Sequence, residues 1–211
     1  MKKILALFLA LAMILAAGLA CADTLEITPG TPTNCTFDNF KTYFSLMTSA
    51  AGYNFVWDET AASENGFDVY TAVSEDGAMT TRIYCADGNV SYVQGNGTLI
   101  VDMNDQASAQ KFGEWLGASF SGSCLGLYAG EEGPTALADV TTQFQNELSP
   151  LLTSVTGKLT SDEQMKNGVA DVTTALGYQA GLEISGGTEG TVITMNMQIF
   201  VASKDAQLAV K

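Results

Sequence analysis

The fold class follows from residues 67–102, FDVYTAVSEDGAMTTRIYCADGNVSYVQGNGTLIVD. Apolar and polar residues alternate here, which predicts half-buried strands at 67–73, 79–85, 89–94 and 98–102. Between these strands lie the dipeptides Asp76-Gly77, Asp87-Gly88 and Asn96-Gly97. Tight hairpin turns need positive φ at their central positions, and such pairs tolerate it well. The stretch therefore predicts an antiparallel meander.

Amphipathic helices are predicted on both sides of the meander. A first helix begins after the N-cap Thr36, carries apolar residues at helical spacing and ends at Gly52. A strand at 53–57 then leads into the meander. A second helix follows the meander and ends near Phe120, with its apolar residues again on one side.

The rest of the chain predicts a Gly/Ser-rich loop at 121–135, helices at 136–149 and 161–176, and strands at 178–184 and 193–201. Gly186-Gly187 is expected in the last turn. The final strand alternates apolar residues with Thr194, Asn196 and Gln198. One sheet face is therefore expected to be buried and the other open to solvent. Helices packed on the buried face of an antiparallel meander make the fold class α+β.

We expect a single α+β domain at 34–211, preceded by a flexible lead at 23–33 and a cleaved signal peptide at 1–22. The mature chain would have about 189 residues, which is enough for one domain with a substantial core. The alternative is two subdomains, 34–125 and 135–211, that meet at the predicted loop.

Residues 1–22 have the three parts of a bacterial-type secretory signal peptide. Two lysines come first. The uncharged apolar run at 4–17 is shorter than the roughly 20 residues that span a membrane. Ala20-Cys21-Ala22 then supplies a small-residue cleavage site before Asp23. The mature protein is therefore expected to be secreted or to reside in the cell envelope.

A lipid anchor on Cys21 is the alternative for this segment. Lipoprotein signals usually carry leucine three positions before the cysteine, but here that residue is Gly18, and Leu19 comes one position later. We therefore favour cleavage over lipidation. No other stretch of the sequence approaches the length of a transmembrane segment, so without the lipid the protein would be released or held by a partner.

The composition is strongly acidic, with 9 Lys+Arg against 23 Asp+Glu. Loss of the two signal-peptide lysines leaves 7 basic against 23 acidic residues, a net charge of −16. Such a surface repels phosphate backbones and anionic lipid, so no nucleic-acid partner is expected. The carboxylates are scattered, which is typical of a solubilising surface. The expected partner is an unidentified protein or glycan outside the cytoplasm.

The chain contains no histidine. Ser-His-Asp triads, Cys-His pairs, His-ligated zinc or copper sites and histidine pH switches all need an imidazole, so this chain cannot form them by itself. Any catalysis would have to use Asp or Glu, a Ser-Lys pair or a bound cofactor. We predict no catalytic residue, no cofactor and no metal site.

Two short motifs resemble catalytic signatures but lack the required context. Residues 122–126, GSCLG, have the G-x-C-x-G spacing of a nucleophile elbow, which needs a preceding strand and a histidine base. Residues 108–111, SAQK, match S-x-x-K but lie within a predicted amphipathic helix, and no Lys-Thr-Gly strand follows. Both are interpreted as ordinary structural residues.

These observations favour an exported, non-catalytic binding or interaction module. The candidate ligand-binding residues are those expected on the open sheet face: Tyr84, Tyr92, Asn196 and Gln198. The alternative is a carboxylate-dependent hydrolase that acts on cell-wall or environmental glycans. A glycosidase needs two carboxyl groups about 5–9.5 Å apart. With 23 acidic residues, the sequence alone does not indicate which pair that would be.

Cleavage after Ala22 would leave three cysteines, Cys35, Cys85 and Cys124. Disulfides form in oxidising compartments, and they need Cα atoms within about 7 Å. The predicted strand directions place Cys35 and Cys85 at one end of the sheet, whereas the second helix carries Cys124 to the other. We therefore expect a Cys35–Cys85 disulfide and a free thiol at Cys124. The alternative is three reduced, buried cysteines.

The exported protein is predicted to begin at Asp23, because Ala20 and Ala22 satisfy the small-residue rule for signal-peptide cleavage. Intact-mass measurement of protein recovered from the medium or the envelope checks this start. A mass that includes a diacylglycerol-modified Cys21 would contradict it.

Overall fold

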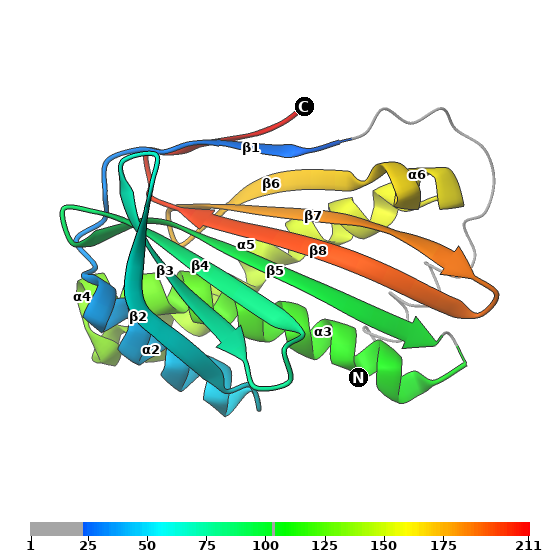
Figure 1. Cartoon of the computed structure of the whole chain (residues 1–211), viewed down its shortest axis with the longest axis horizontal. Helices are drawn as coiled ribbons and strands as arrows, with labels where there is room; N and C mark the ends of the chain where they lie inside the picture. The colour runs from blue at the N-terminus through cyan, green and yellow to red at the C-terminus, as the bar shows by residue number, and fades with distance from the viewer. Residues whose placement is uncertain (1–22, 103) are drawn as a thin grey trace.

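The computed structural model describes residues 23–102 and 104–211 (Figure 1). The predicted signal peptide and Cys21 lie outside these residues. The strands are β1 (Leu25–Thr28), β2 (Phe55–Glu64), β3 (Phe67–Ser74), β4 (Met79–Ala86), β5 (Asn89–Asp102), β6 (Val169–Ala175), β7 (Tyr178–Glu189), β8 (Val192–Ala202) and β9 (Gln207–Val210). The helices are α2 (Phe37–Ala50), α3 (Gln106–Phe120), α4 (Gly126–Glu132), α5 (Leu137–Lys158) and α6 (Asp162–Asn167).

Seven antiparallel strands form one sheet in the order β2-β3-β4-β5-β8-β7-β6, and β1 pairs with β9 in a separate ribbon. This combination of helices and an antiparallel sheet confirms the α+β class. The predicted N-cap of the first helix is also confirmed, because the Thr36 side chain accepts a hydrogen bond from the Asn39 N–H. Strands from both halves of the chain share the seven-stranded sheet.

The main core lies between the sheet and the helices α2, α3 and α5, which Figure 1 shows on the same side of the sheet. Phe40 and Phe44 of α2, Trp115 of α3 and Leu151 of α5 are all buried in it. Each large apolar side chain removed from water contributes about 1.5–3 kcal/mol, so this face accounts for much of the stability. No helix of the described residues is long and apolar enough to cross a membrane.

The opposite face of the sheet is covered only in part. The β1–β9 ribbon packs on β6, β7 and β8 through a small cluster that includes Leu25, Ala170 and Phe200. Thr24 and Lys211 exchange two backbone hydrogen bonds, of 2.9 and 3.0 Å, at the end of the ribbon. The lead that was expected to be flexible therefore contains a strand. Beyond the ribbon part of this face is open to solvent, as at Ile100, which is 67% exposed.

The predicted hairpin at Asn96-Gly97 is wrong. β5 is one strand of 14 residues, and it pairs with β8 from Tyr92 opposite Ala202 to Asp102 opposite Val192. A Cβ atom at Gly97 would lie 2.2 Å from the Trp115 ring. This glycine therefore permits close approach of α3 to the sheet. Glycine inside a strand can mark such a contact as well as a turn or a bulge.

Two further predictions for the C-terminal half are wrong. The helix predicted at 161–176 ends at Asn167, and Gly168, with φ at 92°, leads into β6. The β-branched residues of β6 pack well on a sheet, which outweighs their helix-like spacing. The last turn lies at Gly190, with φ at 62°, rather than at Gly186-Gly187.

The Gly/Ser-rich segment predicted as a loop at 121–135 is mostly helical. It forms a π-helical turn, Ser121–Leu125, followed by α4, and both pack against α2. A Cβ atom at Gly130 would lie 2.1 Å from the Cys35 sulfur. The glycines in this segment therefore allow helices to approach closely.

The helix predicted at 136–149 is longer than expected, because α5 extends to Lys158.

Gly97→Ala is predicted to lower the free energy of unfolding by about 1–3 kcal/mol, because the added methyl group would overlap the buried Trp115 ring. Gly187→Ala is the matched control, since Gly187 also lies in a strand and has nothing within 4 Å of the added atom. The control is expected to change stability by less than about 0.5 kcal/mol. Urea denaturation followed by circular dichroism measures both, and equal transition midpoints would contradict the close approach.

Candidate functional site

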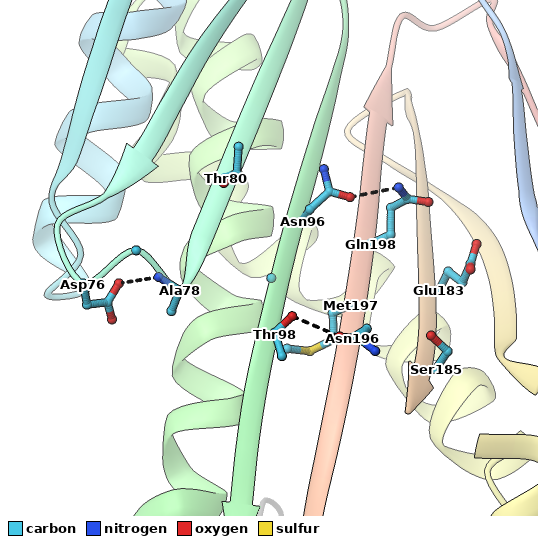
Figure 2. A pocket seen from close by; sticks show the side chains of 12 residues that line it. Asp76, Ala78, Thr80, Asn96, Thr98, Glu183, Ser185, Asn196, Met197 and Gln198 are labelled. Atoms are coloured by element: carbon cyan, nitrogen blue, oxygen red, sulfur yellow. Dashed lines mark hydrogen bonds between the residues drawn. The ribbon is translucent and has the colours of Figure 1, made fainter. Parts of the chain in front are cut away.

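A hollow of about 530 Å³ opens on the uncovered face of the sheet. Its floor is formed by β5 and β8, and its sides by the β3–β4 turn and by β7 (Figure 2). The lining residues are mostly small and polar: Asp76, Gly77, Ala78, Thr80, Asn96, Gly97, Thr98, Glu183, Ser185, Asn196, Met197 and Gln198. This hollow, lined by convergent polar side chains, is our candidate binding site.

The strand register places the polar residues of the floor in two rows, because residues opposite each other in antiparallel strands share a face. The first row runs across four strands, through Thr80, Asn96, Gln198 and Glu183. The second row, two residues further along, contains Thr98, Asn196 and Ser185. The floor is therefore a regular array of amides and hydroxyls with a carboxylate at one margin.

Two cross-strand hydrogen bonds hold the floor in place. The Gln198 amide N–H donates to Asn96 Oδ1 at 2.9 Å, and the Thr98 hydroxyl donates to Asn196 Oδ1 at 2.9 Å (Figure 2). Each bond joins β5 to β8. The amide groups are therefore positioned before a ligand arrives, which reduces the ordering cost of binding.

Two carboxylates lie on opposite sides of the hollow. Asp76 Oδ1 accepts from the Ser74 hydroxyl at 2.6 Å and from the Ala78 N–H at 3.1 Å. These two bonds, the Ser74 bond foremost, hold the pKa of Asp76 below its usual range. On the other side, Glu183 Oε2 accepts from the backbone N–H of Leu25 at 3.1 Å, which links β1 to the rim of the hollow.

The arrangement of these carboxylates does not suit glycoside hydrolysis. β5 and β8 lie between β4 and β7, so three interstrand spacings, about 14 Å, separate the two sides of the hollow. Glycosidase carboxyl groups lie about 5–9.5 Å apart. Asp76 and Glu183 are therefore not spaced as a glycosidase pair.

The predicted site residues separate into two groups. Asn196 and Gln198 line the hollow, whereas Tyr84 and Tyr92 lie outside it. The two tyrosine rings stack at a centroid distance of 4.0 Å, and Phe67 packs edge-on against both. Tyr84 was expected to be exposed on the open sheet face, but it is only 4% exposed. These rings form a local packing cluster beneath the start of β3.

The remaining lining residues were missed because they depend on strand pairing. Asn96 was expected in a turn, and Thr98 was given no partner in sequence. Glu183 belongs to a strand that was correctly expected, but only the register brings it beside Gln198. Asn96 and Thr98 alternate with Gly95, Gly97 and Leu99, and this alternation was the one local signal of a continuous strand. It was missed because the dipeptide Asn96-Gly97 has the composition of a hairpin turn.

Glu131, which lies next to Glu132 in the last turn of α4, has a structural role. Its carboxylate accepts from the Tyr178 hydroxyl and from the Asn34 N–H, and Lys204 Nζ lies 3.4 Å away. Burial opposes its ionisation, but these partners outweigh that effect and hold the pKa of Glu131 below its usual range. The Glu131 carboxylate therefore joins α4 to β7 and to the segment before α2.

The three described cysteines are all free and buried. The expected Cys35–Cys85 disulfide is therefore not formed. Val90 of β5 donates its N–H to the Cys35 carbonyl and pairs on its other side with Cys85. Two interstrand spacings, about 10 Å, thus separate the two cysteine Cα atoms, which is beyond disulfide range.

Cys124 is also free, but its expected position is wrong. Because β5 continues without a turn, α3 starts at the opposite end of the sheet from the one assumed and runs back toward α2. Cys124 is fully buried in the turn that follows α3, within the same core as Cys35 and Cys85. The G-x-C-x-G motif around it follows a helix, and no histidine exists to activate the thiol.

No protein-family model matches the chain, and no curated protein or solved structure matches it. The hollow is therefore interpreted from its own side chains. Within residues 23–102 and 104–211, no three Asp, Glu or Cys side chains are grouped so that they could hold a metal ion. What the hollow offers is an ordered set of neutral hydrogen-bonding groups between two margins that each carry an acidic residue.

The protein that begins at Asp23 is predicted to react with less than one equivalent of DTNB when folded and with three when unfolded. Burial raises the pKa of Cys35 and of Cys85 to about 12 and also raises that of Cys124, so no thiolate is present at mildly alkaline pH. Titration with and without guanidinium chloride, before any reduction, gives both numbers. A single thiol in the unfolded, unreduced protein would show that a disulfide had formed.

Proposed function

We propose that this protein is an exported, non-catalytic binding module that takes its ligand in the hollow on the open sheet face. The observation that carries the proposal is the floor: amides and hydroxyls of β5 and β8 are aligned in two rows and held by cross-strand hydrogen bonds. Groups that are exposed, ordered and incompletely bonded are suited to recognition.

Several features support binding rather than catalysis. The chain lacks histidine, and the two carboxylates of the hollow are too widely separated to act on one glycosidic bond. The cysteines are buried away from the hollow. The side chains of the floor are neutral over the whole physiological pH range, so they offer hydrogen bonds but no proton transfer.

The location proposed for this activity is outside the cytoplasm. Cleavage after Ala22 would leave Asp23 beside the β1–β9 ribbon, where Asp23 lies 3.5 Å from Lys158. The mature protein would then be secreted or held in the cell envelope by its partner. A lipid on Cys21 remains the alternative means of retention in the envelope.

The proposal predicts that a ligand shifts the side-chain amide NMR signals of Asn96, Asn196 and Gln198. The ¹⁵N-labelled exported protein is titrated with a panel of neutral amino acids, short peptides, monosaccharides and oligosaccharides. Asn196→Ala is expected to weaken binding of any responding compound about tenfold, the loss of roughly one good hydrogen bond. Thr194→Ala is the matched control, because Thr194 is exposed on the same strand but does not line the hollow.

Two outcomes would contradict this function. Signals that shift only outside the hollow, for example around Tyr84 and Tyr92, would move the site elsewhere. Conversion of a compound into products during the titration, visible in proton spectra of the same samples, would show that the protein is an enzyme.

A further inference from the structure

The charged residues that line the hollow disfavour anionic ligands. None of the described residues that line it is lysine or arginine, and Asp76 and Glu183 make both margins negative. A phosphate, sulfate or carboxylate would find no cationic side chain among the lining residues, and the net charge of the chain, −14, would repel it further. The ligand is therefore neutral at the floor.

The hydrogen-bonding groups that remain free both donate and accept. The two cross-strand bonds leave the amide N–H groups of Asn96 and Asn196 and the carbonyl oxygen of Gln198 for a ligand. Thr80 and Ser185 add hydroxyls to the same surface. A sugar hydroxyl likewise donates one hydrogen bond and accepts others, so neighbouring hydroxyls of a sugar match this mixed array.

The two margins add acceptors of a stronger kind. Asp76 uses Oδ1 for its bonds to Ser74 and Ala78, and Glu183 uses Oε2 for Leu25. Each carboxylate keeps a second oxygen for further bonds. Hydrogen bonds from hydroxyls to carboxylates are charge-assisted and about twice as strong as neutral ones, which suits hydroxyl donors at both ends of a ligand.

A protein partner fits this hollow poorly. None of the described lining residues is Trp, Tyr, Phe or Arg, although Trp, Tyr and Arg provide most binding hot spots between proteins. The volume of about 530 Å³ also lies within the range of small-molecule sites, about 300–1,000 Å³. These two observations favour a small, hydroxyl-rich ligand.

The separation of the margins favours more than one sugar ring. About 14 Å, or three interstrand spacings, lies between them. A six-membered sugar ring is built from single bonds of about 1.5 Å, so it is roughly 6 Å across when the hydroxyl oxygens on opposite sides are included. A monosaccharide therefore cannot reach Asp76 and Glu183 together, whereas a chain of several rings can lie across all four strands.

We infer that the hollow binds a neutral oligosaccharide laid across β4, β5, β8 and β7, an inference that rests on the proposed binding function and names its ligand class. The two rows of amides and hydroxyls contact the ring hydroxyls, and Asp76 and Glu183 accept from hydroxyls near the two ends.

The test compares five probes on the ¹⁵N-labelled exported protein: linear tetrasaccharides of glucose, mannose and N-acetylglucosamine, the anionic tetragalacturonate, and tetraserine as a hydroxyl-bearing peptide. At least one neutral tetrasaccharide is expected to shift the side-chain amides of Asn96, Asn196 and Gln198. It should bind at least tenfold more tightly than its own monosaccharide and than tetragalacturonate.

Variants then assign the contacts. Asn196→Ala and Thr98→Ala are each expected to weaken the tetrasaccharide about tenfold, whereas Thr194→Ala should change its Kd by less than about twofold. Both altered residues are exposed, so the variants should fold, and the backbone spectrum confirms that each does. Equal affinity of all variants would overturn the inference.

The remaining outcomes separate this inference from the function on which it rests. If tetraserine or tetragalacturonate shifts the floor amides and no neutral tetrasaccharide does, the saccharide inference is wrong and the binding module stands. If none of the five probes and no compound of the wider panel shifts these amides, both are wrong.

Discussion

The pairing of β5 with β8 is the constraint on which the rest of the structure depends. It joins residues 92–102 to residues 192–202 and so makes one sheet from two separate antiparallel units. The same ladder buries Val93 and Ile199 beneath the helices and leaves Asn96 and Gln198 facing solvent. A register shift of one residue would exchange these two faces, so the core and the candidate site specify the same pairing.

Local signals predicted the elements whose neighbours are close in sequence. The first helix, with its Thr36 cap, and the hairpins at Asp76-Gly77 and Asp87-Gly88 all follow from side chains within a few residues of each turn. The prediction failed where a distant contact decides the conformation. Asn96-Gly97 has the composition of a turn, but Trp115 occupies the space beside Gly97 and eleven pairs with β8 keep the strand extended.

For the same reason, the sequence predicted only the β8 residues of the candidate site. Strand alternation was enough to place Asn196 and Gln198 on the open face, because one strand suffices for that. Their hydrogen-bond partners come from a strand about one hundred residues earlier, which no local pattern reveals. For Tyr84, strand alternation predicted an exposed side chain. Its strand position does face outward, but Phe67, at the start of β3, packs against the ring and buries it.

In the binding function that we propose, the charged residues of this acidic protein have two separate tasks. Most carboxylates lie on the surface and provide solubility, and those near the hollow are fixed at its margins by backbone N–H groups. At the margins these carboxylates leave the floor of the hollow free of charge, so the proposed ligand would not have to cover an unpaired charge. The floor can then select by the geometry of its hydrogen bonds, which demand a complementary pattern of hydroxyls and reject a ligand that leaves them unpaired.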